Sequence, residues 1–344
     1  MPLYKSNRFL KPELPTVAIT IGDPFGIGPE IVLKALASRK FSRLANFLIV
    51  GDEAVISADS ALLKPAFRLD TQALISDFNI IKRKSEIRFG RPDAVSGGAS
   101  LAYLDCALDL IKDKRADCLV TAPVSKEAIS ASGIKFSGHT EYIAAEFGVE
   151  NFAMMLLGGP LRVTLATRHL PIRDLPKAIT ESEILKCVRL SYETLKDYFG
   201  IISPRIGVAS LNPHGGESGF IGDEELKVIR PAVRKARRRF RNITGPVSSE
   251  TLFYEAFRKR LDCVIAMYHD QGLTPLKMIA RDKSVNVTLG LPFVRTSPGH
   301  GTAFDIAGKG TANPESMIEA IKMAIDMHNA KLINKRQGMR VVNL

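Results

Sequence analysis

The chain has 344 residues, of which 45% are hydrophobic and 24% charged, so it is neither disordered nor a low-complexity or collagen-like scaffold. This length predicts two domains or one large one. The net charge of +12 favours anionic partners, from nucleic acid and acidic lipid to phosphorylated or carboxylated small molecules.

Short apolar runs alternate with longer amphipathic stretches along the chain. The apolar runs predict strands at residues 16–21, 46–50, 118–121, 205–209 and 262–267. The amphipathic stretches predict helices at residues 29–38, 98–112, 182–198, 223–240 and 313–330. Two further runs, 152–157 and 162–166, predict a hairpin around Gly158-Gly159-Pro160. This alternation predicts an α/β fold with a largely parallel core sheet, and the absence of a repeat or a long linker predicts interwoven domains.

Cysteine usage and the chain start indicate the compartment. The chain has four cysteines, Cys106, Cys118, Cys187 and Cys263. None forms a C-x-x-C pair, so we expect reduced thiols in a cytoplasmic protein rather than a sulfur-rich zinc site. Residues 1–15 carry three basic side chains but no apolar core, which does not fit a secretory signal. No run approaches the roughly 18 apolar residues of a membrane span, so no membrane partner is expected.

A dense basic run lies on the predicted helix 223–240 and contributes much of the net charge. Its members are Arg230, Arg234, Lys235, Arg237, Arg238, Arg239 and Arg241. We interpret it as a solvated helix face, with cations near the C-terminus that suit the helix dipole. Nucleic acid is not expected as a partner, since there is no Trp and only 7% of residues are aromatic, which leaves few stacking platforms.

Ligands of open α/β proteins gather beyond the carboxyl ends of strands, so polar loops after apolar runs are the candidates. The first is residues 22–30, GDPFGIGPE, in which glycines and a helix start suit either an anion or a tight structural turn. Its spacing differs from the GxGxxG dinucleotide fingerprint.

Histidines supply a stronger signal. The six are His139, His169, His214, His269, His300 and His328. Four of them, at 169, 214, 269 and 300, lie in polar loops after strands or at helix starts, and His139 also opens a predicted helix. His328 lies inside an amphipathic helix, where packing is the better interpretation. Three imidazoles from separate loops would make a catalytic-type divalent metal site, although spacing alone does not show that they converge.

Two later segments complete the candidate chemistry. Lys277, Asn286 and Arg295 suit the recognition of carboxylate or phosphate, and ordinary surface charge is the alternative for any single lysine. Residues 299–314 place Asp305 between two glycine-rich turns. This segment either holds a nucleotide, with Asp305 near adenosine, or is a loop into the last helix.

Five of these segments together resemble the 4-hydroxythreonine-4-phosphate dehydrogenase family of vitamin B6 biosynthesis. They read GDPFGIGPE, GHTE, NPHGGE, YHDQGL and TLGLPFVRTS, and they occur in this order between about Val17 and Ile321. Residues 26–30 and 300–314 also resemble the isocitrate and isopropylmalate dehydrogenases. The resemblance implies their fold, with two interwoven α/β domains of largely parallel sheets, residues 1–128 with 300–344 and residues 129–299.

The resemblance also implies a homodimer whose second domain forms the interface and carries most site residues, and whose partner subunit contributes to each active site. The metal ligands match His169, His214 and His269. The substrate contacts match His139, Thr140, Lys277, Asn286 and Arg295. The cofactor-binding loop matches His300, Gly301, Thr302, Asp305, Ala307 and Gly308. Asp270 is a hypothetical base or a partner that orients His269, and Lys277 is a second catalytic candidate.

The implied reaction is oxidation of 4-phosphooxy-L-threonine at C3 by NAD or NADP, followed by loss of carbon dioxide to give 3-amino-2-oxopropyl phosphate. It needs one divalent metal, and Zn, Mg, Co and Mn all remain open. A sister group that acts on D-threonate or D-erythronate 4-phosphate is the alternative, because those substrates differ mainly at C2. This chain departs from the family pattern at Glu250, where an Asp is expected, and at Pro298-Gly299, where an acidic residue often precedes the histidine.

Overall fold

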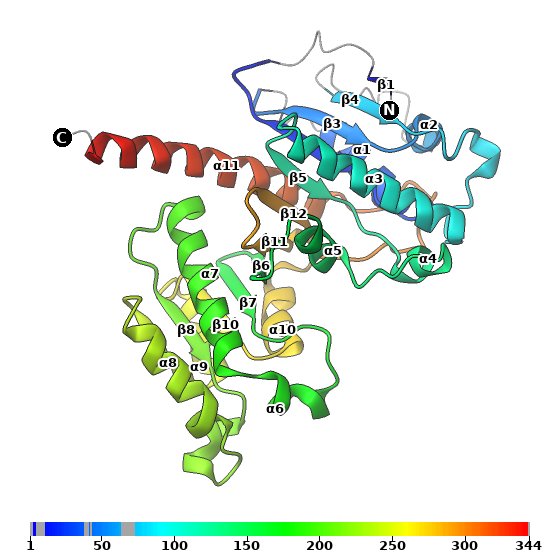
Figure 1. Cartoon of the computed structure of the whole chain (residues 1–344). Helices are drawn as coiled ribbons and strands as arrows, with labels where there is room; N and C mark the ends of the chain where they lie inside the picture. Colours follow the sequence, from blue (N-terminus) through cyan, green and yellow to red (C-terminus); the bar gives the residue numbers. More distant parts are fainter. Residues whose placement is uncertain (1–2, 5–10, 38–40, 42, 63–72, 343–344) are drawn as a thin grey trace. The chain divides into compact units, whose positions relative to one another are not determined.

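The computed structural model describes residues 3–4, 11–37, 41, 43–62 and 73–342. The chain divides into two compact units, each built from two separate segments (Figure 1). Unit 1 comprises Met1–Gly148 and Pro292–His328, and unit 2 comprises Val149–Leu291 and Asn329–Leu344. The domain boundaries expected from the sequence lie at 128/129 and 299/300, and they remain predictions. Two of the basic residues of the N-terminal segment, Lys5 and Arg8, lie outside the described residues.

Unit 1 is built on strands in the order β1-β4-β3-β2-β5-β12. All neighbours are parallel except β1 and β4, which pair antiparallel. The strands are β1 (Leu3–Tyr4), β2 (Thr16–Thr20), β3 (Asn46–Val50), β4 (Ala73–Asp77), β5 (Cys118–Thr121) and β12 (Val294–Pro298). β3, β5 and β12 are buried at every residue, as expected for parallel strands covered on both faces.

Helices cover the sheet of unit 1. They are α1 (Gly28–Ala37), α2 (Glu53–Leu62), the 3-10 turn η2 (Lys84–Glu86), α3 (Ala94–Lys112), α4 (Lys126–Ala131), α5 (His139–Glu146) and the first part of α11 (Glu315–Val342). By length and composition α3 is apolar enough to cross a membrane. However, 61% of that stretch is buried and α3 packs on β2, β3 and β5, so it is a core helix of unit 1.

Unit 2 is built on strands in the order β11-β6-β7-β10-β8-β9. They are β6 (Ala153–Gly158), β7 (Leu161–Leu165), β8 (Ile206–Ala209), β9 (Ile243–Val247), β10 (Cys263–Ala266) and β11 (Val285–Leu289). β7, β10, β8 and β9 are mutually parallel, and β6 is antiparallel to both of its neighbours. The β6–β7 pair is the predicted hairpin. The α/β class with largely parallel sheets is therefore confirmed.

Helices cover both faces of the unit 2 sheet. Along β7, Thr164 hydrogen-bonds Ser191 of α7 (Glu181–Phe199) at 2.7 Å. Val163 points the other way, into a cluster with Leu252 of α9 (Ser249–Phe257) and Leu276 of α10 (His269–Ala280). Shorter turns and helices complete the unit: η3 (Ile172–Asp174), α6 (Leu175–Ala178), η4 (Pro213–Gly219), η5 (Glu225–Ile229), α8 (Arg230–Arg237) and η6 (Arg281–Lys283).

Two predicted helices have different bounds in the structure. The stretch 223–240 begins with the π-helical turn η5 and ends as α8 at Arg237, because the chain then turns through Asn242 at positive φ into β9. The guanidinium of Arg237 fixes this turn by donating to the carbonyl of Ile243 at 2.9 Å. The last helix, α11, runs on to Val342 and crosses from unit 1 to unit 2.

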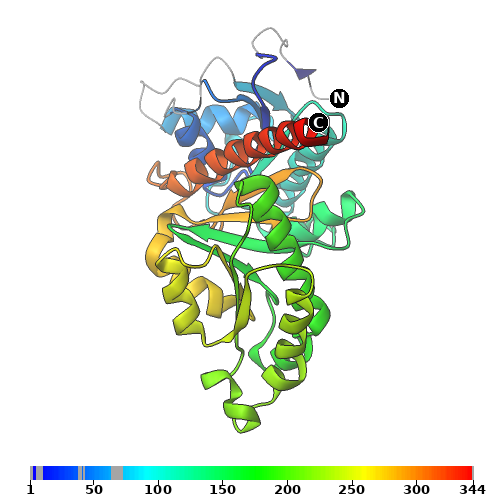
Figure 2. The ribbon, with the colours of Figure 1, turned by 90° about the vertical axis from the view of Figure 1, so that its left-hand side faces the viewer.

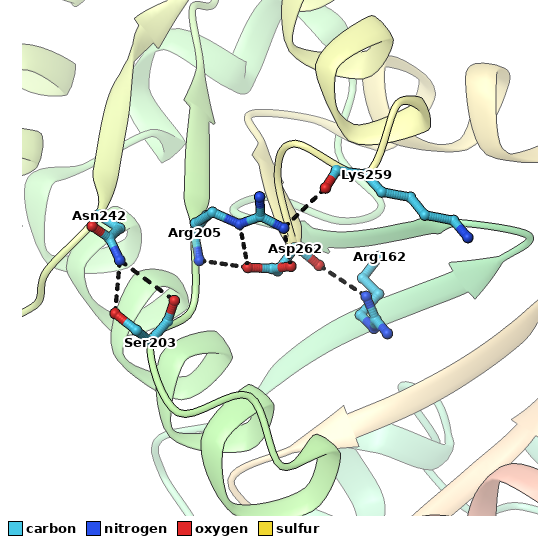
Figure 3. A network of polar contacts seen from close by, with 6 residues as sticks. All are labelled: Arg162, Ser203, Arg205, Asn242, Lys259 and Asp262. Atoms are coloured by element: carbon cyan, nitrogen blue, oxygen red, sulfur yellow. Dashed lines mark hydrogen bonds and ion pairs between the residues drawn. The ribbon is translucent and has the colours of Figure 1, made fainter.

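A polar network joins the amino ends of β8 and β10 (Figure 3). Arg205 precedes β8, and its guanidinium donates to both carboxylate oxygens of Asp262, which precedes β10, at 3.0 and 2.9 Å. The backbone N–H of Arg205 adds a bond of 2.8 Å to the same carboxylate. Although burial acts to raise it, these hydrogen bonds lower the pKa of Asp262. The network ties two parallel strands together at the end of the sheet opposite the loops that follow β8 and β10.

Candidate active site

In unit 1, a buried arginine near the start of β12 extends its side chain to the carboxyl end of the neighbouring strand β5. Arg295 of β12 is only 2% exposed, and its Nη2 donates to the hydroxyl of Thr121, the last residue of β5, at 2.6 Å. Burial lowers the pKa of Arg295 to about 10, while the charge of Glu141 acts in the opposite direction. The side chain is therefore still a cation at neutral pH, held rigidly inside the protein.

Two predicted substrate contacts, His139 and Thr140, open helix α5 next to this arginine. Burial lowers the pKa of His139 well below its ordinary value, and the positive charges of Arg295 and Lys126 lower it further. The imidazole is therefore neutral at physiological pH, and its Nε2 is buried with no hydrogen-bond partner. Together, two cations, a neutral imidazole and the N-terminus of a helix make a surface suited to an anion.

In unit 2, parallel strand pairing brings His169 and His269 together. His169 follows β7 and His269 follows β10, and these strands are parallel neighbours. The pairing continues past the strands, since the backbone N–H and the hydroxyl of Thr167 both donate to the carbonyl of Met267. The two imidazole rings lie 5.5 Å apart between centroids. They line a pocket of about 240 Å³ together with Tyr268 and Asp270.

Asp270 has a defined partner in this pocket. Its Oδ1 lies 2.6 Å from Nδ1 of His269. An ionised carboxylate only accepts hydrogen bonds, so Nδ1 carries the proton and Nε2 is the nitrogen left for a ligand. This arrangement matches the way carboxylates orient metal-binding histidines. It favours the interpretation of Asp270 as the partner that orients His269.

The third predicted metal ligand, His214, lies in an unusual loop. Residues 214–218 of η4 all have positive φ, including His214 itself at 51°. Buried Glu225 supports this loop by accepting from the backbone N–H groups of Leu211 and Asn212 at 2.7 and 2.8 Å. Strained backbone of this kind clusters at functional sites. His214 also lies close enough to Glu250 to help lower the pKa of that carboxylate, after hydrogen bonds from Ser248 and its own backbone.

The described part of one chain holds no group of three His, Cys, Asp or Glu side chains able to hold a metal. His169 and His269 are paired within one chain, but His214 does not join them as a third member of the cluster. Imidazole nitrogens are good ligands for Zn²⁺, Co²⁺ and related cations. The two adjacent imidazoles, one of them oriented by Asp270, suit such an ion, and a third ligand from outside this pair would complete a three-histidine site.

Lys277 and Asn286 are near one another in unit 2 through Ser284. The Nζ of Lys277, two turns along α10 from His269, donates to the hydroxyl of Ser284 at 2.7 Å. Burial lowers the pKa of Lys277, and Arg281 lowers it further. On β11, the side-chain Oδ1 of Asn286 is buried with no hydrogen-bond partner. An acceptor in that position is available for a donor group of a ligand.

The predicted cofactor loop, His300 to Gly308, lies entirely in unit 1 and packs on the loop 22–28. The backbone N–H of Ile27 donates to the carbonyl of Thr302 at 3.0 Å. Gly28 is required here, because a Cβ atom at this position would lie 2.1 Å from the carbonyl oxygen of Ile21. Asp305 and Gly301 are exposed, whereas Ala307 is buried and His300 is half-buried. The loop after β2 thus packs against the predicted cofactor loop and supports it.

An ion pair on α1 fixes the end of this loop. The Nζ of Lys34 contacts Oε1 of Glu30 at 2.6 Å and donates to the carbonyls of Gly310 and Ala312. The same carboxylate oxygen accepts from the backbone N–H of Ala312 at 2.8 Å. Glu30 is fully buried, so the clamp is shielded from water. It ties the loop 300–312 to the first helix of the chain.

The structure also identifies contributors that the sequence interpretation missed. Gln271 accepts from the backbone N–H of Met267 at 2.6 Å and donates to the carbonyl of Ser210 and the hydroxyl of Ser249. It therefore ties β10, β8 and α9 together beside His269. Thr121 and Lys126 contribute to the arginine site of unit 1. The same signal, polar residues at or shortly after the end of an apolar strand, could have found all three.

Comparison with known proteins places this geometry in a family. The profile of the pyridoxal phosphate biosynthetic protein PdxA matches residues 43–324. A 4-hydroxythreonine-4-phosphate dehydrogenase of Desulforapulum autotrophicum is 42% identical over 90% of this chain and 94% of its own length. The chain belongs to the PdxA family. It is a dehydrogenase, and the family implies a nicotinamide cofactor.

Other relatives show that this family includes enzymes named for different substrates. The crystal structure of a 4-hydroxythreonine-4-phosphate dehydrogenase from Klebsiella pneumoniae matches with a TM-score of 0.81 at 34% identity, covering 91% of this chain and 99% of that one. A D-threonate 4-phosphate dehydrogenase of Cupriavidus necator is 39% identical over 91% of this chain and 97% of its own length. Both substrate classes named in the sequence interpretation therefore occur among its relatives.

A buried acid beside the Glu30 clamp gives a pH-dependent prediction. Asp59 of α2 is fully buried, neither of its carboxylate oxygens has a hydrogen-bond partner, and burial followed by the charge of Glu30 raises its pKa from 3.8 to about 7. Because the folded pKa is the higher one, stability is lost as pH rises from about 4 through 7. We expect Asp59→Asn to raise the free energy of unfolding by about 1–3 kcal/mol at pH 8 and to leave it nearly unchanged at pH 4.

Urea denaturation of both proteins across this pH range checks the prediction. Asp113→Asn, at an exposed position of unit 1, serves as the control and should not alter the pH dependence. A difference between Asp59→Asn and the wild type that stays constant between pH 4 and 8 would contradict the assignment.

Proposed function

We propose that the protein oxidises 4-phosphooxy-L-threonine at C3 with NAD⁺ or NADP⁺ and that the product loses carbon dioxide to give 3-amino-2-oxopropyl phosphate. The reaction would supply an intermediate of pyridoxal 5'-phosphate biosynthesis. The observation that carries the proposal is the pair His169–His269 with Asp270 behind it, at the carboxyl ends of adjacent parallel strands. Membership of the PdxA family gives this constellation its chemical context.

The anionic groups of the substrate have matching partners in the chain. Arg295 and the N-terminus of α5, with His139 and Thr140, suit a phosphate or carboxylate group. The guanidinium is held by Thr121 before the substrate arrives, so little reorganisation is needed on binding. Asn286 offers its buried carbonyl oxygen to a hydroxyl or ammonium group.

Lys277 is the proposed proton acceptor. Its lowered pKa makes the neutral amine, the form able to accept a proton, more accessible near neutral pH. The bond to the hydroxyl of Ser284 fixes the position of Nζ. In this proposal the C3 hydroxyl proton passes to Nζ of Lys277, while Asp270 orients His269.

His169, His269 and His214 would hold the divalent metal. A bound cation of this kind supplies Lewis acidity toward the substrate hydroxyl and carbonyl oxygens. Asp270 keeps Nε2 of His269 available as a ligand, and Glu225 holds the His214 loop. The exposed residues of the loop 300–308, with Asp305 among them, would bind the adenosine part of the nicotinamide cofactor.

A homodimer would complete the three-histidine site, because one chain pairs His169 with His269 but leaves His214 outside the cluster. Exposed apolar side chains support a partner surface on the α9–α10 face of unit 2. Tyr254 and Phe257 of α9 are 59% and 50% exposed, and Met278 of α10 is 83% exposed. Phe220, six residues after His214, is 89% exposed. Large apolar groups gathered on one face are typical of subunit interfaces.

The alternative function is oxidation of D-threonate or D-erythronate 4-phosphate, supported by the Cupriavidus necator relative. It would use the same metal and anion-binding residues. Four cysteines without a disulfide support a cytoplasmic location in either case.

The two functions are separated by the formation of reduced cofactor at 340 nm with purified protein and a divalent metal. We expect a kcat/KM for 4-phosphooxy-L-threonine about tenfold above that for D-threonate 4-phosphate, because a charge-assisted hydrogen bond from an ammonium group to the carbonyl oxygen of Asn286 is stronger than a neutral one from a hydroxyl. Parallel assays with NAD⁺ and NADP⁺ identify the preferred cofactor. EDTA should abolish activity, and added Zn²⁺, Co²⁺, Mn²⁺ or Mg²⁺ should restore it.

Preferred turnover of the sugar acid would move the protein to the alternative function. Activity that persists after exhaustive chelation would contradict the metal site.

The role of Asp270 is tested by Asp270→Asn. An amide can present its oxygen to His269, but it carries no charge to hold the Nδ1–H tautomer, so we expect metal affinity to fall by about 10- to 100-fold. The measurement is metal content after equilibrium dialysis at graded free Zn²⁺, with kcat determined at saturating metal. Asp174→Asn changes an exposed acid in the neighbouring turn η3 and serves as the control. Wild-type metal affinity together with a lost kcat would instead make Asp270 the proton acceptor.

The shared metal site is tested by mixing two inactive variants, His214→Ala and His269→Ala. If His214 reaches the site from the partner subunit, a mixed dimer contains one intact three-histidine site. We expect activity to reappear after co-refolding or co-expression, at about a quarter of the wild-type level. Either variant treated alone in the same way is the control and should stay inactive. Mixed dimers confirmed by differential tags but without activity would show that both histidines serve the same site within one chain.

A further inference from the structure

In unit 2, helix α7 packs against α8 (Figures 1 and 2). Basic side chains gather between these two helices. This is the face of the sheet opposite α9 and α10, since Thr164 of β7 reaches Ser191 of α7 there. The side chains surround a pocket of about 580 Å³. Its lining residues are Asn151, Ser182, Leu185, Lys186, Arg189, Lys235, Arg238, Arg239 and Phe240. Five of them are cationic and none is acidic, and none belongs to the candidate active site.

The cations of this pocket fall into two groups. Three are balanced by glutamates outside the lining: Lys186 by Glu183, Arg189 by Glu193 and Lys235 by Glu181. For Arg238 and Arg239, the described part of the chain shows no side-chain hydrogen bond or ion pair. These two exposed guanidinium groups therefore leave the pocket with a positive charge that no protein group offsets. A ligand with at least two negative charges would neutralise it.

Polar and aromatic groups complete the lining. Ser182 lies in the first turn of α7, where backbone N–H groups have no acceptor within the helix. Of these groups, the hydroxyl of the N-cap residue Thr180 accepts a hydrogen bond only from the N–H of Glu183. The amide of Asn151 is a further donor. Phe240 packs against Tyr192 at 4.9 Å between ring centroids and forms a rigid apolar wall.

A solvated helix face does not explain this arrangement fully. Arg237 of the same basic run is bound to the backbone carbonyl of Ile243, and it does not line the pocket. Arg238 and Arg239 instead face a concavity whose volume lies within the range of small-molecule sites, roughly 300–1,000 Å³. Guanidinium groups bind phosphate oxygens in pairs of parallel hydrogen bonds.

We propose that the pocket between α7 and α8 binds a small polyphosphate, an anion with a diphosphate or triphosphate group, at a site separate from the dehydrogenase site. Arg238 and Arg239 bind the phosphates, with Lys186, Arg189 and Lys235 adding to the positive field. The source is either an inorganic polyphosphate or a nucleotide, and Phe240 offers a surface for the base of the latter. The site does not depend on the proposed reaction.

Isothermal titration calorimetry of the full chain with inorganic pyrophosphate, tripolyphosphate, ATP and orthophosphate tests the proposal. We expect pyrophosphate and tripolyphosphate to bind, and we expect orthophosphate to bind far more weakly. The double variant Arg238→Ala/Arg239→Ala should weaken binding by at least about tenfold, because it removes the charge-assisted hydrogen bonds to the phosphates. Tighter binding of ATP than of tripolyphosphate would assign the site to a nucleotide, and the reverse order to an inorganic polyphosphate.

The matched control is Arg234→Ala/Arg241→Ala, which removes the same charge from the same basic run at exposed positions outside the pocket. This control should bind pyrophosphate within about twofold of the wild type. Equal weakening by both double variants would show a diffuse electrostatic effect and overturn the site. Absence of pyrophosphate binding to the wild type would also overturn it, as would binding of a mixed-sequence DNA duplex that depends on Arg238 and Arg239 while the polyphosphates do not bind.

Discussion

The parallel pairing of β7 with β10 is the constraint on which the candidate site depends. Residues 163–165 lie opposite residues 264–266 in register, so the loops that follow the two strands start at the same edge of the sheet. Thr167 extends the pairing to Met267, and Gln271 then ties the end of β10 to β8 and α9. His169 and His269 are 100 residues apart in sequence, and these hydrogen bonds bring their rings to 5.5 Å. At the opposite end, the guanidinium of Arg162 on β7 donates to the carbonyl of Asp262 at 3.3 Å, and the Arg205–Asp262 hydrogen bonds tie β10 to β8.

The second constraint on the structure is the burial of a charged side chain, Arg295, in unit 1. An isolated buried guanidinium is costly, and Arg295 is tolerated because Thr121 accepts from it and the charge of Glu141 partly offsets it. Burial first, and then the positive charges of Arg295 and Lys126, lower the pKa of His139 and keep it neutral. A cation and a neutral imidazole fixed in this way need no rearrangement when an anion arrives, which is the condition for strong binding in a site with little water. The cost of burying Arg295 is thus part of the preparation for the ligand.

Much of the fold can be predicted from the sequence, because the central strands are continuous apolar runs and the long helices have clear periodicity. The predictions for β2, β3, β5 and α7 agree with the structure to within one or two residues. α10 was not predicted, because it begins with the polar residues of the candidate site and contains Pro275. Likewise, β12 contains buried Arg295, which interrupts the apolar pattern. At both places, polar residues of the candidate site interrupt the apolar pattern from which a helix or strand is predicted.

The candidate residues were found from sequence because polar residues stand directly after strands, but their grouping was not. Strand order limits which loops can meet, and strand order depends on pairings between segments far apart in the chain. His169 and His269 meet because β10 lies beside β7 in the sheet. His214 follows β8, the other parallel neighbour of β10, and lies outside their cluster, so strand order alone does not decide the grouping. The strained loop that holds His214 is fixed by Glu225, whose role no local pattern indicates.

The basic residues of this chain have two different physical roles, although they count equally in the net charge of +12. Arg295 is buried, so salt screens its field weakly and its strength toward an anion changes little with ionic strength. Arg238 and Arg239 are exposed at the end of α8, where a Debye length of about 8 Å at physiological salt limits their reach. Only their convergence on one concavity, with no acid in its lining, makes them more than surface charge. Burial thus gives the proposed anion site of unit 1 a cation whose field hardly depends on salt, whereas occupancy of the proposed site of unit 2 would follow the ionic conditions.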